Sequence, residues 1–162
     1  MLLALVLAFA IPTYGPIPGP SAAPVPGYLR VPTSSDEALI VDSGSTNRAG
    51  YRLRVHASGL VTLQQGDAPS QKHVSATLVK RFFADLKAAG PLDRLTTMRC
   101  MKSASFGSSM QIGYRGKLSP DLTCPSSSSA ARALAVDAGA LADAAGVTLL
   151  PGRPRPSGME SS

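Results

Sequence analysis

Residues 51–65, YRLRVHASGLVTLQQ, hold two short segments joined by a Ser-Gly dipeptide. From Tyr51 to Ala57 every second residue is apolar, and the positions between them are occupied by Arg52, Arg54 and His56. A period of two places alternate side chains on opposite faces of a β-strand. Ser58-Gly59 fits a two-residue turn, after which residues 60–65 can return as the antiparallel partner. The stretch therefore predicts a β-hairpin with a basic outer face.

The segments on either side of this hairpin extend the prediction. Residues 38–41, ALIV, form a short apolar run bounded by turn-forming residues, which is typical of a buried strand. Residues 42–50, DSGSTNRAG, have the composition of a loop, and Gly44 and Asn47 can adopt positive φ there. Residues 66–70, GDAPS, are expected to end the hairpin.

Two later segments have helical periodicity. The first begins near Ser75, a candidate N-cap, and ends at Gly90-Pro91; its apolar stripe comprises Leu78, Val79, Phe82, Phe83 and Leu86. The second spans residues 127–145, is rich in alanine, and has Gly146 as a stop signal; its apolar positions are Leu134, Ala138, Leu141 and Ala145.

A second hairpin is predicted between the two helices. Ser108, Met110, Ile112 and Tyr114 alternate with smaller or polar residues, and Arg115-Gly116 turns the chain into Lys117-Leu118. The order is strand, hairpin, helix, hairpin, helix. It predicts an α+β fold, in which a small antiparallel sheet built from hairpins carries two helices packed on one face.

The ends of the chain differ from this core. Residues 1–10, MLLALVLAFA, are apolar and end in Ala-Phe-Ala, which resembles the apolar region and cleavage site of a secretion signal, although no basic residue precedes them. Residues 11–33 have a proline every two to four positions, as in a semi-rigid linker. We expect one domain over residues 34–150, a disordered tail over 151–162, and export to the periplasm or the extracellular space.

The two cysteines, Cys100 and Cys124, support this assignment. An isolated pair in an exported chain is most simply a disulfide, here closing a loop of 23 intervening residues. The alternative is a zinc site that adds His56 and His73, but none of the four residues has the short spacing of a zinc motif. No metal and no cofactor are expected, since the chain also lacks a P-loop and a G-x-G-x-x-G motif.

The formal net charge of +6 permits attraction to anionic partners. The basic residues are scattered, however, and aromatic residues make up only 5% of the chain. Base stacking on aromatic side chains is a main source of single-strand affinity, so this composition argues against nucleic-acid binding.

Asp42 raises the question of catalysis, because Asp-Ser-Gly follows an apolar run as in an aspartic protease. That mechanism needs two carboxylates sharing a proton. The other candidate segment, residues 136–139, reads VDAG, has alanine in place of Ser or Thr, and lies in a helical pattern. A homodimer could instead supply two copies of Asp42. A serine nucleophile is disfavoured, because the chain has only two histidines and no G-x-S-x-G elbow.

Several motifs together resemble a known group of proteins. A GSTN...GY segment precedes the first hairpin, and a C-x-KS-x-SFG...SPDL-x-C pattern spans residues 100–124. This combination is similar to a group of uncharacterised exported bacterial proteins, over about residues 38–147. The order of elements is also similar, in architecture alone, to the emfourin-type inhibitors of metalloproteases. Neither likeness assigns a function to a residue.

The cysteine-containing pattern indicates a candidate binding edge, because a disulfide would hold its two loops together. This edge consists of Lys102, Ser103, Ser105, Phe106, Ser119 and Asp121. The other interpretation is that these residues only shape turns. The sequence thus predicts a non-enzymatic exported domain that binds another protein, in its sharpest form a protease inhibitor. The alternative is an aspartic-type hydrolase that uses Asp42 in a homodimer.

Overall fold

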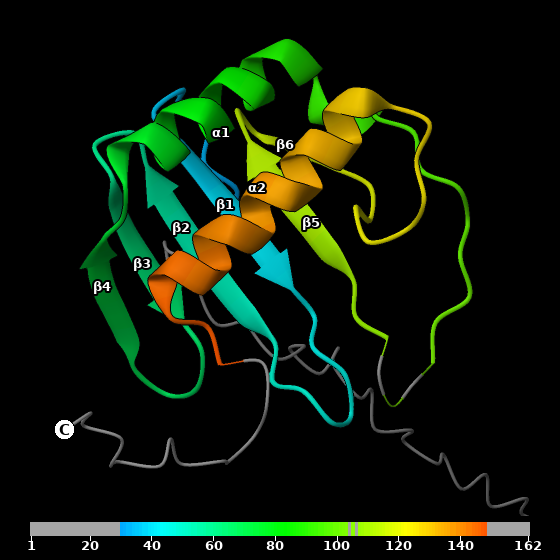
Figure 1. The fold of residues 1–162 in the computed structure, drawn as a ribbon, viewed down its shortest axis with the longest axis horizontal. Coiled ribbons are helices and arrows are strands. Elements are labelled where there is room, and N and C mark those ends of the chain that lie inside the picture. Colours follow the sequence, from blue (N-terminus) through cyan, green and yellow to red (C-terminus); the bar gives the residue numbers. More distant parts are fainter. Residues whose placement is uncertain (1–29, 104, 106, 149–162) are drawn as a thin grey trace, which may run out of the picture.

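The computed structural model describes residues 30–103, 105 and 107–148, and shows two layers: an antiparallel sheet and a pair of helices on one of its faces (Figure 1). The sheet has the strand order β4-β3-β2-β1-β5-β6. The predicted α+β class is confirmed. The elements are β1 (Glu37–Asp42), β2 (Tyr51–His56), β3 (Leu60–Gln64), β4 (Pro69–His73), α1 (Ala76–Ala89), the short 3-10 helix η2 (Leu92–Arg94), β5 (Met110–Tyr114), β6 (Lys117–Leu118) and α2 (Ser129–Ala145).

The strand β1 organises the sheet, because it pairs with β2 on one side and β5 on the other. Ala38 lies opposite Tyr114 at one end of the β1–β5 ladder, and Asp42 lies opposite Met110 at the other. This register brings the loop after β1 next to the long loop before β5. Both predicted hairpins are present, with Gly59 and Gly116 at positive φ in their turns.

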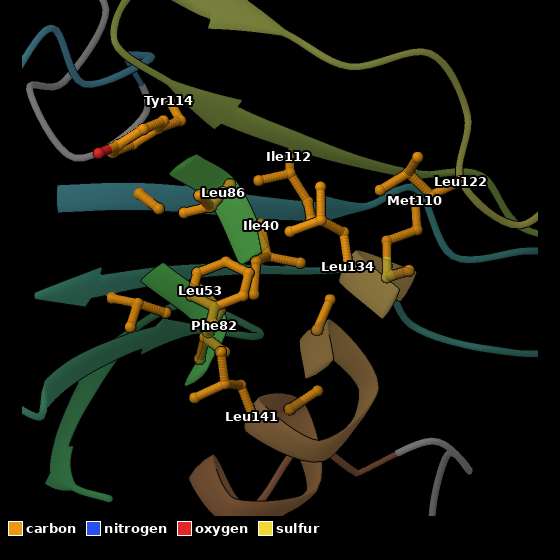
Figure 2. Close-up of a cluster of buried hydrophobic side chains, with 14 of the residues drawn as sticks. Ile40, Leu53, Phe82, Leu86, Met110, Ile112, Tyr114, Leu122, Leu134 and Leu141 are labelled. Carbon is orange, nitrogen blue, oxygen red and sulfur yellow. The ribbon is translucent and has the colours of Figure 1, made fainter. Parts of the chain in front are cut away.

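The core fills the space between the sheet and the helices (Figure 2). Alternation along β2 sends Leu53 and Val55 into it, as predicted from the spacing, and Phe82 of α1 is fully buried above them. All four predicted apolar positions of α2 are also buried. Burial of side chains of this size contributes about 1.5–3 kcal/mol each, so this layer supplies most of the stability.

The opposite face of the sheet is partly covered by the chain that enters β1. A Cβ placed on Gly113 would lie 2.9 Å from a methyl carbon of Val31, so the strand approaches this segment closely. Pro32 is buried, and its carbonyl accepts a hydrogen bond from Gly116 N at 2.7 Å. Packing therefore begins three residues before the expected domain start at residue 34. The signal-like segment 1–10, most of the proline-rich linker and the tail 151–162 lie outside the described residues.

The helix ends follow the predicted signals with one exception. Gly146 ends α2 at φ 87°, as predicted. Ser128, for which no capping role was predicted, caps the start of α2, since its Oγ accepts from Ala131 N. Ser75 occupies the N-cap position of α1, but its side chain makes no capping hydrogen bond, so that part of the prediction is wrong. No helix in the described part of the chain is both long and apolar enough to cross a membrane.

The strand β4 was missed. Residues 66–70 were expected to end the hairpin, but Pro69 already begins a strand that pairs with β3. All five residues of β4 are exposed, so the segment has no apolar alternation from which a strand could be predicted. His73 is the last residue of this edge strand.

Candidate functional site

Three loops meet beyond one end of β1 and β5, and we call them together the loop edge: residues 43–50, 95–103, 105, 107–109 and 119–124. The disulfide between Cys100 and Cys124 joins two of them, with 5.5 Å between the Cα atoms. This confirms the predicted pairing. Because both sulfurs are bonded to each other, they cannot act as zinc ligands, and the structure reveals no metal-binding cluster of His, Cys, Asp or Glu among the residues that it describes.

Asp42 ends β1 with its side chain only 5% exposed. Its Oδ1 accepts from Gly44 N at 2.8 Å, and Arg48 Nη2 lies 2.6 Å from Oδ1 and 2.5 Å from Oδ2. The Ser108 hydroxyl accepts from Arg48 Nη2 at 2.5 Å and donates to Asp42 Oδ2 at 3.4 Å. These three partners occupy both carboxylate oxygens, and none of them is acidic.

The local fold explains this arrangement. Gly44 has φ 66°, and a Cβ there would lie 2.4 Å from Gly50 N, so the loop closes tightly on itself. Reciprocal backbone hydrogen bonds between Ser45 and Arg48 bring the arginine back over Asp42. The motif that suggested catalysis is therefore a closed loop stabilised by an internal ion pair. A dyad across a homodimer remains a hypothesis, and it would require Arg48 to leave the carboxylate.

The charge of Asp42 also acts on the neighbouring strand. Tyr51, opposite Asp42 in the β1–β2 ladder, is buried. Burial of the phenol, followed by the negative charge of Asp42, raises the pKa of Tyr51 to about 12. Both effects disfavour a second anion beside the carboxylate, so Tyr51 stays neutral at physiological pH.

A second network lies at the other side of the loop edge. Lys102 Nζ donates to Asp121 Oδ2, to Thr123 Oγ1 and to the carbonyl of Ser108. Asp121 Oδ1 accepts from Met110 N at 3.1 Å and from Thr123 N at 3.0 Å. Burial of Asp121 opposes its ionisation, but the hydrogen bonds from Lys102, Thr123 and Met110 outweigh this and lower its pKa. Lys102 and Asp121 were both predicted to lie on the binding edge, and their side chains are in contact.

The other residues of the predicted binding edge that the structure describes do not take part in the Lys102–Asp121 network. The carbonyl of Ser105 accepts from Ser45 Oγ at 3.0 Å, and the Oγ of Ser103 accepts from Ser105 N at 3.2 Å, so both belong to the braced loop. Ser119 is buried and its Oγ accepts from Ile112 N at 2.9 Å. Ser119 therefore stabilises the chain next to β5, and its buried side chain is not exposed to a binding partner. Phe106 lies outside the described residues.

Two methionines of the loop edge were not among the predicted residues. Met98 is 62% exposed, and Met101, directly after Cys100, is fully exposed. Methionine, with its flexible and polarisable side chain, is common at adaptable binding surfaces. The sequence carries no signal for this, because the exposure of a residue outside a periodic element depends on how the loop folds.

A further acidic pair lies between the helices, away from the loop edge. Arg81 of α1 contacts Asp137 of α2, with Nε 2.8 Å from Oδ1. Burial, then the charge of Asp137 and a hydrogen bond to it, raise the pKa of Asp85. Asp137 Oδ2 is buried and has no hydrogen-bond partner among the residues that the structure describes. The VDAG aspartate thus has an acidic neighbour, but it is Asp85 rather than Asp42.

Comparison of the chain with protein-family models, with curated proteins and with solved structures gave no match. The class that the fold and the site define is therefore a small α+β domain with a disulfide-braced loop edge.

Proposed function

We propose that this chain is an exported, non-enzymatic domain that binds another protein through the loop edge. The observation that carries the proposal is Met101, which is fully exposed beside a disulfide. Burial of this exposed apolar side chain by a partner would remove it from water, which is favourable. Methionine is also enriched in protein–protein interfaces relative to the rest of the surface.

The two networks support a binding role over a catalytic one. Asp42, Lys102 and Asp121 have polar partners inside the domain, so each acts to fix a loop. A nucleophile or a general base would instead need a group available to substrate. The sharpest form of the proposal is a protease inhibitor, which presents a braced loop with an exposed apolar residue to the protease. The resemblance to exported bacterial proteins and the disulfide both favour an oxidising compartment as the location.

The experiment compares the parent protein with a Met101→Asp variant in a pull-down from the native periplasmic or extracellular milieu. We expect the parent to retain a protein that the variant loses, because a charge would have to be desolvated at the centre of the interface. A Gln71→Asp variant on the exposed strand β4 is the matched control and should retain the partner. Capture that is equal for all three proteins would place the interface elsewhere.

The inhibitor form has its own test. Micromolar parent protein is added to a panel of metallo-, serine and aspartic proteases, and residual activity is measured. We expect inhibition of one class that Met101→Asp weakens by at least about tenfold. If every protease keeps its full activity, the protein is not a protease inhibitor. The pull-down then still tests the broader proposal that the loop edge binds another protein.

A further inference from the structure

A groove runs along α1 at the end of the sheet opposite the loop edge. Its volume is about 570 Å³, within the usual range for small-molecule sites. Its lining is mainly apolar, with Val79 and Phe83 of α1 facing Tyr114 of β5; Ala57, Ala76 and Ala84 complete this part of the lining. The rings of Phe83 and Tyr114 meet edge to face at 6.0 Å. We call this surface the α1 groove.

The groove continues into a basic hollow. A second depression of about 280 Å³ shares Lys87 and Tyr114 with the α1 groove and adds Arg115 and Lys117. Figure 2 shows Tyr114 at the margin of the core, with its hydroxyl directed away from the cluster. That hydroxyl donates to the carbonyl of Ser35 at 3.0 Å, which fixes the ring that both hollows share.

The three cationic side chains near Tyr114 differ in whether they have an anionic partner. Lys117 contacts Asp93 at 2.9 Å, and its charge is therefore already balanced. The guanidinium of Arg115 lies 5.4 Å from the centre of the Tyr114 ring and makes no ion pair with any residue that the structure describes. Lys87 makes no hydrogen bond or ion pair with any residue in the described part of the chain. Two cations without an anionic partner thus adjoin one end of an apolar groove.

The other end of the groove carries both signs of charge. Asp36 lines it there, with its carboxylate 3.3 Å from His56 Nε2, and Lys80 lines it two helical turns before Lys87. The opposite charges of Asp36 and Lys80 offset each other, so an anionic group on a ligand is attracted most strongly to Lys87 and Arg115. The apolar middle between the two ends offers few hydrogen-bond partners, so an extended peptide would leave its backbone groups unsatisfied there. The arrangement favours one anionic head group on an apolar chain.

We propose that the α1 groove binds a free fatty acid, with its carboxylate at Lys87 and Arg115 and its alkyl chain over Phe83 and Ala84. Burial of the chain supplies most of the affinity, since each methylene removed from water contributes about 0.8 kcal/mol. The two cations set the orientation and select for the carboxylate. This site is independent of the loop edge, because Tyr114 and Met110 lie at opposite ends of β5.

The test uses the full chain and dodecanoate labelled with ¹³C at the carboxyl carbon, followed by titration calorimetry and NMR. We expect saturable binding, with a shift of the carboxyl resonance. The Lys87→Gln/Arg115→Asn double variant should weaken binding by at least about tenfold, and Asn suits position 115 because its φ is 49°. Dodecyltrimethylammonium, with the same chain and the opposite charge, should bind far more weakly.

A matched pair of variants on α1 tests the groove itself. Ala84 lines the groove and Ala88 does not, yet both are exposed positions of the same helix. Ala84→Glu should abolish dodecanoate binding, and Ala88→Glu, with the same change of charge, should preserve it. Absence of saturable binding by the parent, equal effects of the two variants, or equal binding of the cationic amphiphile would each overturn the proposal. Preference for an acidic peptide over dodecanoate would overturn it as well.

Discussion

Arg48 lies over the carboxylate of Asp42, six residues earlier, with 2.5 Å between Nη2 and Oδ2. The aspartate side chain is 5% exposed and the arginine side chain 25%. The pair is thus largely removed from water and satisfied within one loop. Loss of one partner would leave the other charge buried and unpaired, which is far more costly than the loss of an exposed pair.

We therefore expect Arg48→Gln to lower the free energy of unfolding by about 3 kcal/mol. The double variant Asp42→Asn/Arg48→Gln should recover part of this loss, because it removes the orphaned charge. Urea unfolding of the three variants and the parent measures the coupling. Lys117→Gln, which breaks the exposed pair with Asp93, is the control and should change stability little. If Arg48→Gln had no effect, the ion pair would not contribute to the folded state.

The same pair offers a test of the hydrolase hypothesis. A proton shared between two carboxylates requires Asp42 to approach a second acid, whereas Arg48 already contacts both of its carboxylate oxygens. We expect no peptide hydrolysis by the parent protein at mildly acidic pH. Hydrolysis that disappears in Asp42→Asn would establish the catalytic role and contradict the expectation.

The closure of the loop depends on Gly44. Its φ is 66°, and an added Cβ would lie 2.5 Å from the carbonyl oxygen of Arg48. We expect Gly44→Ala to lower the unfolding free energy by more than about 3 kcal/mol, since backbone strain and a clash add together. Gly66→Ala is the matched control: its φ is 85°, but no atom lies within 4 Å of the added Cβ. Only the strain remains there, so about 1 kcal/mol is expected. Equal losses in both variants, measured by chemical unfolding, would show that the close approach is absent.

The disulfide should matter most for the loop edge. We expect reduction, or the Cys100→Ser/Cys124→Ser variant, to lower the unfolding free energy by about 3 kcal/mol. Hydrogen exchange should accelerate in residues 95–109 and 119–124 while β1, β2 and β3 keep their protection, because the core contacts do not include the disulfide. Uniform acceleration over the whole sheet would instead mean that the bridge is part of the core's cooperative unit.

The sequence predicts those elements whose side chains alternate between core and solvent. The periodicities of β2 and of both helices determined their buried faces correctly, because burial and secondary structure repeat together there. The strand β4 has no buried face, and only its hydrogen bonds to β3 define it. Such a strand is a consequence of the tertiary structure, and no pattern in its own residues marks it.

The contacts of the candidate site could likewise be predicted only in part from the sequence. The spacing of the cysteines indicated that Lys102 and Asp121 lie near each other, and this required only the disulfide. The partner of Asp42 depends on how residues 43–50 close, which involves Gly44 and the Ser45–Arg48 bridge together. The pairing of Asp85 with Asp137 depends on how α1 packs on α2. Contacts of this kind arise from the three-dimensional arrangement, which single-sequence spacing does not encode.

The proximity of Asp85 to Asp137 makes the free energy of unfolding depend on pH in a defined direction. The pKa of Asp85 is raised in the folded protein, first by burial and then by Asp137, so folding favours its protonated form. The charged groups around it are Arg81 on α1 and Arg132 and Asp137 on α2. The stabilisation from the protonated carboxyl is fully present below the unfolded pKa, about 3.9, and is lost as the pH rises through the higher folded pKa.

Asp85→Asn mimics the protonated state, because the amide is neutral and can donate to the buried Asp137 Oδ2. We expect this variant to be more stable than the parent at neutral pH, with a difference that shrinks as the pH falls toward the unfolded pKa. Urea unfolding of both proteins over a series of pH values measures this difference. Asp85→Ala separates the two causes: it removes the charge without supplying a donor, so its gain should be smaller than that of Asp85→Asn. A difference between Asp85→Asn and the parent that stayed constant with pH would show that Asp85 titrates alike in the folded and unfolded states.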